Sequence, residues 1–189
     1  MRLFLASLSL CALPLCALAD EVSDKLQSAL EAYARGDLKT TTLDMAMASG
    51  ALALQKQARI IALLPPAPDG WTLSVNEDYT SNLALAGGGA GTEARYSDAS
   101  GNTMTLSITA DSPMMTMGMA GMFMNEQMLA MMGKLVEVPG AKLLEQDNSL
   151  MTLVDQRILV NISGLPVDQM MPFVEQIDFE KLAAFDTAP

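Results

Sequence analysis

The chain has 189 residues, a formal net charge of −11 at neutral pH and no histidine. An acidic chain without clusters of Lys and Arg disfavours binding to nucleic acid, whose phosphates attract basic side chains. Serine triads that need a histidine, and zinc sites that need imidazole ligands, are excluded as well.

Residues 1–19 have the features of a cleavable export signal. Arg2 supplies a short basic start, an apolar stretch continues to Cys16, and small residues form a cleavage site before Asp20. The apolar stretch is too short for a transmembrane anchor. We therefore expect a periplasmic mature chain that begins at Asp20 and lacks both cysteines, which excludes disulfides and thiol nucleophiles.

Residues 20–64 predict a helical hairpin. Apolar residues recur at helical spacing up to Tyr33, Gly36 ends the first helix, and Asp37 is a good N-cap for the second. The turn resembles that of a tetratricopeptide hairpin, but a repeat solenoid needs about three such units and only one is visible. We favour a plain antiparallel helix pair, which the proline-rich linker of residues 65–70 ends.

Beyond the linker, residues 71–189 predict an α+β sandwich domain. Short turns between consecutive strands favour antiparallel pairing, and a helix that contains Pro172 and a final short helix capped by Asp178 follow the strands. The expected fold is an antiparallel sheet of about six to seven strands, with a Met-rich helix and a C-terminal helix packed on it. The strand candidates are residues 71–75, 92–98, 103–110, 134–138, 141–146, 149–154 and 157–163.

Two polar or glycine-rich stretches resemble parts of ligand-binding loops. Residues 87–91 predict a flexible loop, but a strand follows them and the lysine and hydroxyl of a phosphate-binding loop are missing. Asp98, Ser100 and Asn102 have the spacing that opens a calcium loop, yet its remaining ligands and closing glutamate are absent. We interpret this second stretch as a hairpin turn.

Acidic side chains are plentiful enough to raise the possibility of a hydrolase. Paired acids can hydrolyse glycosides, but the mature chain has few aromatic platforms for a sugar, and no Ser-x-x-Lys motif occurs. We therefore predict a solvated acidic face and no enzymatic activity. The acids concerned are Glu77, Asp78, Asp98, Asp111, Glu126 and Asp155.

The methionine-rich run is the most unusual feature of the chain. Nine methionines lie between Met114 and Met132, and Ser112-Pro113 has the signature of a helix start, so we predict one helix that Gly133 ends. On a helical wheel the run is apolar around most of its circumference, which favours burial on two sides or an exposed apolar patch. One stripe contains Met114, Met117, Met124, Met128 and Met131, and a second contains Met115, Met119, Met122 and Leu129.

Methionine is soft and flexible, which leaves three interpretations of this helix. Its side chains can fill the core between helix and sheet. They can form an adaptable apolar surface, with Met115, Gly118, Met119, Gly121, Met122 and Phe123 as the partner-binding candidates. They can also bind Cu(I) or Ag(I), with candidate ligands Met114, Met117, Met119, Met128, Met131 and Met132.

Several short motifs resemble a group of small exported proteobacterial proteins without assigned activity. They are Tyr33-Ala34-Arg35-Gly36-Asp37, Gly70-Trp71, Asp111-Ser112-Pro113-Met114 and Gly133-Lys134-Leu135-Val136. The resemblance covers most of the mature chain and implies a Gram-negative periplasmic setting without catalytic residues. The order of elements from Trp71 onward also resembles PsbP-like and DcrB-like α/β sandwiches, a likeness of fold alone.

These observations predict a non-enzymatic periplasmic binding or accessory protein. The Met-rich helix, together with the loop of residues 87–91, would form an apolar face for a protein or lipid-like partner without any cofactor. The alternative is a copper-handling protein that holds Cu(I) through thioethers.

Overall fold

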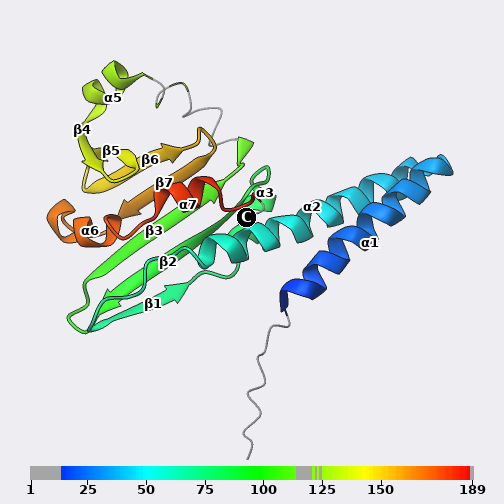
Figure 1. Cartoon of the computed structure of the whole chain (residues 1–189), viewed down its shortest axis with the longest axis horizontal. Helices are drawn as coiled ribbons and strands as arrows, with labels where there is room; N and C mark the ends of the chain where they lie inside the picture. The colour runs from blue at the N-terminus through cyan, green and yellow to red at the C-terminus, as the bar shows by residue number, and fades with distance from the viewer. Residues whose placement is uncertain (1–13, 114–120, 122, 124, 188–189) are drawn as a thin grey trace, which may run out of the picture. The chain divides into compact units, whose positions relative to one another are not determined.

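The structure is a computed structural model in which residues 14–113, 121, 123 and 125–187 are described. It divides into two compact units, Met1–Gln55 and Lys56–Pro189. Helices combine with a seven-stranded antiparallel sheet, which confirms the predicted α+β class (Figure 1). None of the helices in the described ranges has an apolar stretch long enough to cross a membrane.

The first unit is an antiparallel helix pair, as predicted. Helix α1 (Pro14–Ala34) ends before Gly36, whose φ of 76° lies in the left-handed region that glycine adopts without strain. Helix α2 (Leu38–Ile61) begins after Asp37, whose carboxylate accepts a hydrogen bond from the Thr40 amide at 3.0 Å. The N-cap predicted at Asp37 is therefore confirmed.

Small side chains and one buried acid line the contact between α1 and α2. Asp44 is only 6% exposed, accepts a hydrogen bond from Ser28 at 2.6 Å and faces Lys25 at 3.8 Å. Because burial of an unpaired carboxylate is costly, these partners stabilise the pair of helices in one register. The buried alanines in this contact are Ala29, Ala32, Ala48 and Ala51.

The second unit is built on one antiparallel sheet with the order β1-β2-β3-β7-β6-β5-β4. It consists of two meanders, β1–β3 and β4–β7, which are joined by the pairing of β3 with β7. The predicted strands are confirmed to within two residues at their ends. Their bounds are β1 (Trp71–Val75), β2 (Ala90–Asp98), β3 (Thr103–Ala110), β4 (Lys134–Val138), β5 (Ala141–Gln146), β6 (Ser149–Val154) and β7 (Ile158–Ser163).

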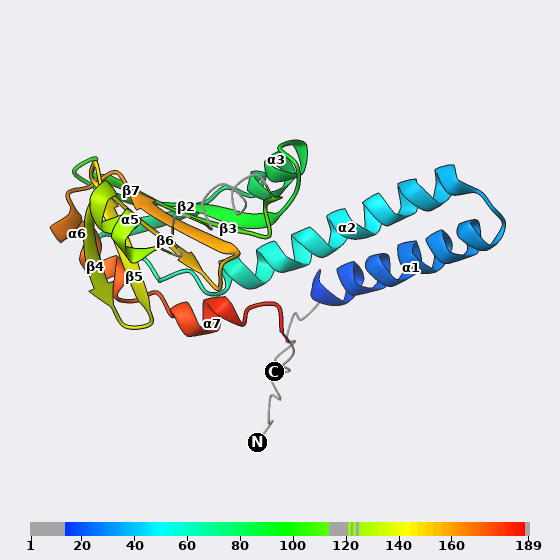
Figure 2. The same cartoon turned by 90° about the horizontal axis from the view of Figure 1, so that it is seen from above.

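The core lies on one face of the sheet, under α6 (Val167–Val174) and α7 (Phe179–Ala183) (Figure 2). Trp71 and Tyr96 pack edge-on against Phe173, with ring centroids 5.3 and 5.4 Å apart. The hydroxyl of Tyr96 donates to the Pro65 carbonyl at 2.7 Å, and burial raises the pKa of Tyr96 to about 12. This aromatic cluster ties the proline-rich linker to the sheet.

Helix α3 (Tyr79–Leu85) was not expected from the sequence, and it lies on the opposite, second face of the sheet (Figure 2). The Thr80 hydroxyl bonds both the amide and the carbonyl of Gly91, and the Tyr79 hydroxyl meets that of Thr109 at 2.9 Å. Gly91 is buried and paired with Thr109 inside the sheet. The prediction of a flexible loop over residues 87–91 is therefore wrong at Ala90 and Gly91, because both belong to β2.

The second face of the sheet is partly apolar in the meander β4–β7. The strand registers place Leu135, Leu144 and Met151 in one row, which continues to Asn161, and a neighbouring row pairs Leu153 with Leu159. Strands β1–β3 carry mainly hydroxyl and charged side chains on this face, such as those of residues 72, 74, 95, 97, 105 and 107. A surface for apolar partners is therefore confined to the β4–β7 half.

Replacing Thr92 by valine should stabilise the protein. The Thr92 side chain is fully buried on the core face of β2, and its hydroxyl has no hydrogen-bond partner in the described ranges. An unsatisfied buried polar group costs about 1–3 kcal/mol, and valine has nearly the same shape. Chemical unfolding should show a gain of about 1 kcal/mol for Thr92→Val. Thr109→Val, which removes a hydroxyl bonded to Tyr79, should instead lose stability.

Candidate functional site

The structure describes only part of the predicted partner-binding and metal-binding residues. Gly121 is exposed and Phe123 is half-buried. Met128, Met131 and Met132 belong to helix α5 (Glu126–Met132). The predicted residues Met114, Met115, Met117, Gly118, Met119 and Met122 lie outside the described residues.

The prediction of one continuous helix through Met132 is wrong at Asn125. This residue has extended backbone angles, φ −118° and ψ 99°, and its side chain accepts hydrogen bonds from the amides of Gln127 and Met128 at 3.0 and 3.2 Å. Asn125 is thus the N-cap of a new helix. The methionine stripes that assumed one continuous helix therefore do not extend across this residue.

Helix α5 has one buried residue and a row of exposed thioethers. Leu129 is 6% exposed, whereas Met128, Met131 and Met132 are 49%, 88% and 40% exposed. The interpretation that the methionines only fill the core is therefore wrong for these three. Gly133 ends α5, as predicted, and passes so close to the Glu145 carbonyl of β5 that a side chain there would clash.

A cavity of about 270 Å³ lies between α5 and the sheet, where β5 and β6 separate. These strands pair only over residues 144–146 and 149–151, whereas β6 pairs with β7 along its whole length. The cavity wall includes the apolar residues Phe123, Leu129, Leu135 and Leu153, together with the charged residues Lys142 and Asp155. The cavity and the exposed thioethers together form the α5 site, defined as Phe123, Met128, Leu129, Met131, Leu135 and Leu153.

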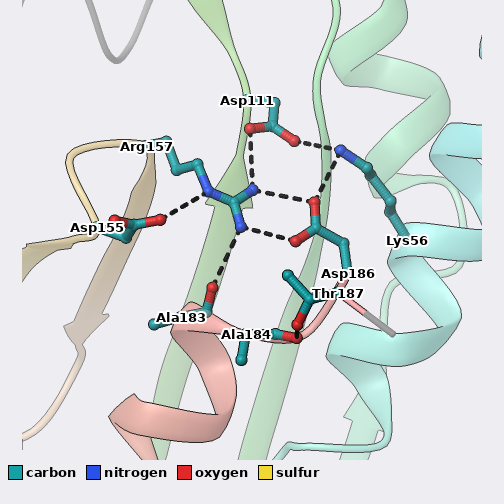
Figure 3. A network of polar contacts seen from close by, with 8 residues as sticks. All are labelled: Lys56, Asp111, Asp155, Arg157, Ala183, Ala184, Asp186 and Thr187. Atoms are coloured by element: carbon teal, nitrogen blue, oxygen red, sulfur yellow. Dashed lines mark hydrogen bonds and ion pairs between the residues drawn. The ribbon is translucent and has the colours of Figure 1, made fainter. Parts of the chain in front are cut away.

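An ion network borders this cavity through Asp155 (Figure 3). The Arg157 guanidinium donates to both oxygens of Asp186 at 2.7 and 3.1 Å, to Asp111 at 3.2 Å and to Asp155 at 3.1 Å. A fifth contact reaches the Ala183 carbonyl at 3.2 Å. Arg157 therefore connects the ends of β3, β6 and α7 at one point.

Lys56, near the end of α2, completes the network. Its ammonium group contacts Asp111 at 2.5 Å and Asp186 at 3.1 Å. Three carboxylates thus share two cations, and the side chains of both cations are about one quarter exposed. The prediction of a solvated acidic face is wrong for Asp111, which is half-buried and ion-paired, whereas the side chain of Asp155 is 60% exposed.

The ion pairs of the network shift the pKa values of Asp186 and Lys56. Hydrogen bonding to Arg157 holds the pKa of Asp186 below its ordinary value, although burial opposes this shift. Burial alone would lower the pKa of Lys56, but its hydrogen bonds to Asp111 and Asp186 raise it above the ordinary value. Asp186 and Lys56 are therefore both charged at neutral pH, and their ion pairs act as a clamp.

Acid should weaken this clamp. Because the pKa of Asp186 is lower in the folded state than in the unfolded chain, its stabilising contribution is complete above the unfolded value of about 3.9. The contribution is lost as the pH falls through the lower, folded value. The difference in unfolding free energy between the wild type and Asp186→Asn should therefore be constant near neutral pH and shrink below about pH 4. A difference that grows on acidification would contradict the assignment.

Two further hollows meet at the β4–β5 turn. One, of about 290 Å³, is formed by Pro139, Gly140 and residues 175–180 between α6 and α7. Another, formed by residues 137, 138 and 140–142, shares Gly140, Ala141 and Lys142 with the cavity of the α5 site. In the described ranges no three His, Cys, Asp or Glu side chains are grouped so that they could hold a metal ion, a finding that does not concern thioether ligands.

Comparison with known protein families, with curated proteins and with solved structures gave no match to this chain. The assignment of a role therefore depends on the site itself. Sequence reasoning found the methionines of α5 but missed the cavity beside them, because its walls come from three separate strands and a helix. It also missed the ion network, because Lys56, Asp111, Arg157 and Asp186 are far apart along the chain.

Proposed function

We propose that this protein is a non-enzymatic periplasmic binding or accessory protein that uses its Met-rich region as an apolar surface for a protein or lipid-like partner. The observation that carries the proposal is helix α5, whose Leu129 lines the cavity while its Met128 and Met131 side chains are exposed. Methionine side chains adapt to varied apolar shapes at low cost, which suits a binding surface. A cavity next to such a surface offers an anchor point for one apolar group.

The proposal is tested with the uncharged dye N-phenyl-1-naphthylamine, whose fluorescence rises in an apolar environment. The mature chain should bind the dye, and the double variant Met128→Lys with Met131→Lys should bind it roughly fivefold more weakly, because two apolar contacts are lost. Leu52→Lys with Leu85→Lys is a matched control: these leucines are 45% and 89% exposed, against 49% and 88% for the two methionines. Equal dye binding by the two double variants, or no binding by the wild type, would overturn the proposal.

A specific observation also favours Cu(I) or Ag(I) binding as a second candidate function. Met128, Met131 and Met132 are at positions i, i+3 and i+4 of α5, and all three are exposed. Three thioethers can hold a soft monovalent ion where thiols would be oxidised. Anaerobic titration against a chromophoric Cu(I) chelator tests this function. The wild type should compete with the chelator, and the variant with all three residues changed to leucine should not.

A further inference from the structure

The hollows at the β4–β5 turn have different chemistry at their two ends. The cavity of the α5 site is apolar on the side of Leu129, Leu135 and Leu153. The hollow between α6 and α7 is bordered by the carboxylates of Glu175, Asp178 and Glu180. Gly140 lies in the wall of both, so the β4–β5 turn is the floor of one groove that is apolar at one end and acidic at the other.

The β4–β5 turn is held directly against the acidic end of this groove. A Cβ atom on Gly140 would be 3.3 Å from the Cβ of Phe179 and 4.0 Å from the side chain of Glu180. The hairpin therefore approaches the start of α7 as closely as a glycine permits.

The acidic end has an uncompensated negative charge. Asp178 is paired with Lys181 at 2.8 Å, and within the described ranges neither Glu175 nor Glu180 has an ion pair. Both glutamates are exposed. The cation at the other end, Lys142, is paired with Glu137 at 3.5 Å. The groove thus attracts positive charge at one end, in a chain whose net charge of −11 adds to the attraction.

Size and charge decide which kind of partner this groove fits. Ligand pockets of about 300–1,000 Å³ enclose whole small molecules, whereas the cavity of the α5 site has about 270 Å³. This cavity therefore fits a single apolar side chain. Anionic lipid headgroups would also be repelled by Glu175 and Glu180.

We infer that the groove around the β4–β5 turn receives an extended, basic segment of a partner protein, with one apolar anchor side chain in the α5 cavity and basic side chains beside Glu175 and Glu180. This inference rests on the proposed function, because the anchor occupies the same α5 site. The anchor supplies most of the affinity, and the acidic end sets the direction of the segment and its preference for basic partners.

Fluorescence anisotropy with a labelled synthetic peptide tests the inference on the mature chain. The peptide contains one tryptophan followed by lysines, and two companions replace either the tryptophan by alanine or the lysines by glutamates. At low salt we expect each replacement to weaken binding roughly tenfold, the first through the lost anchor and the second through charge. Added salt should weaken binding of the lysine peptide more than it affects the dye.

Variants of the protein locate the contact. Glu175→Gln with Glu180→Gln should weaken binding of the lysine peptide roughly threefold at low salt, because two exposed carboxylates are lost. The control Glu21→Gln with Glu77→Gln removes the same net charge from other exposed positions and should leave the affinity unchanged. Equal losses in the two double variants would overturn the inference.

The dye and the peptide separate failure of the inference from failure of the proposed function. If the dye does not bind, the α5 site is not an apolar binding surface, and the proposed function fails. If the dye binds but the peptide does not, or if lysine and glutamate peptides bind equally well, the proposed function stands and this inference fails. Displacement of the dye by a fatty acid but not by the peptide would likewise overturn the inference in favour of a lipid-like ligand.

Discussion

Replacing Arg157 by methionine should lower the free energy of unfolding by about 3 kcal/mol. The substitution keeps an apolar side chain of similar length but removes the group that bonds Asp111, Asp155 and Asp186. Breaking a buried pair costs about 3–5 kcal/mol, and the lower value applies because the Arg157 side chain is 26% exposed. The cation–π contact with Phe185, at 5.4 Å, is lost as well. Chemical denaturation of the wild type and the variant measures the difference.

Two control variants show whether the guanidinium geometry matters. Arg157→Lys keeps the charge but cannot form the two parallel bonds to Asp186, so we expect roughly half of the loss. Lys181→Met breaks an ion pair with Asp178 in which the two side chains are 73% and 43% exposed, and its effect should stay below about 0.5 kcal/mol. If all three variants have equal effects, the network is not a clamp.

Replacing Gly91 by alanine should also cost about 3 kcal/mol or more. A Cβ atom at this position would overlap the carbonyl oxygen of Ile108 and lie 3.1 Å from the Tyr79 ring. Since backbone atoms cannot move aside cheaply, either the pairing of β2 with β3 or the packing of α3 must yield.

Gly50→Ala is the matched control for the Gly91 substitution. Gly50 lies inside α2, and a Cβ there meets nothing within 4 Å. We expect a gain of about 0.5–1 kcal/mol for this change, because alanine has the higher helix propensity. Thermal unfolding of both variants gives the comparison. A mild effect of Gly91→Ala would show that β2 is not held against α3 in the way described.

The elements that could be predicted are those whose signals are local. The alternation of apolar and polar residues after Trp71, with turn residues between the runs, predicted the strands of the sheet. The N-caps predicted at Asp37 and Asp178 are also confirmed. Helix α3 escaped prediction because its residues have little helical bias, and contacts such as that of Thr80 with Gly91 stabilise it. The pairing of β3 with β7 has no signal in a single sequence.

The candidate site was predictable only in part. The methionine bias identified Met128 and Met131, but the helical wheel assumed a continuous helix. Asn125 before Glu126 is a helix-start signal that could have indicated the break. Asp111 was predicted to be solvated because its partners Lys56 and Arg157 are remote in sequence. The cavity depends on the separation of β5 from β6, which composition does not reveal.

The joining of two meanders through β3 and β7 has a consequence for how the chain acquires its structure. Within each meander the strands are connected by short turns, so their pairing carries little loop-closure entropy and is fast. Strand β3 can pair with β7 only after both meanders have formed, and we expect this pairing step to limit the folding rate. Until then the facing edges of β3 and β7 are both uncovered. A chain in this half-assembled state is prone to aggregate, and a protein of this design would benefit from a chaperone during that interval.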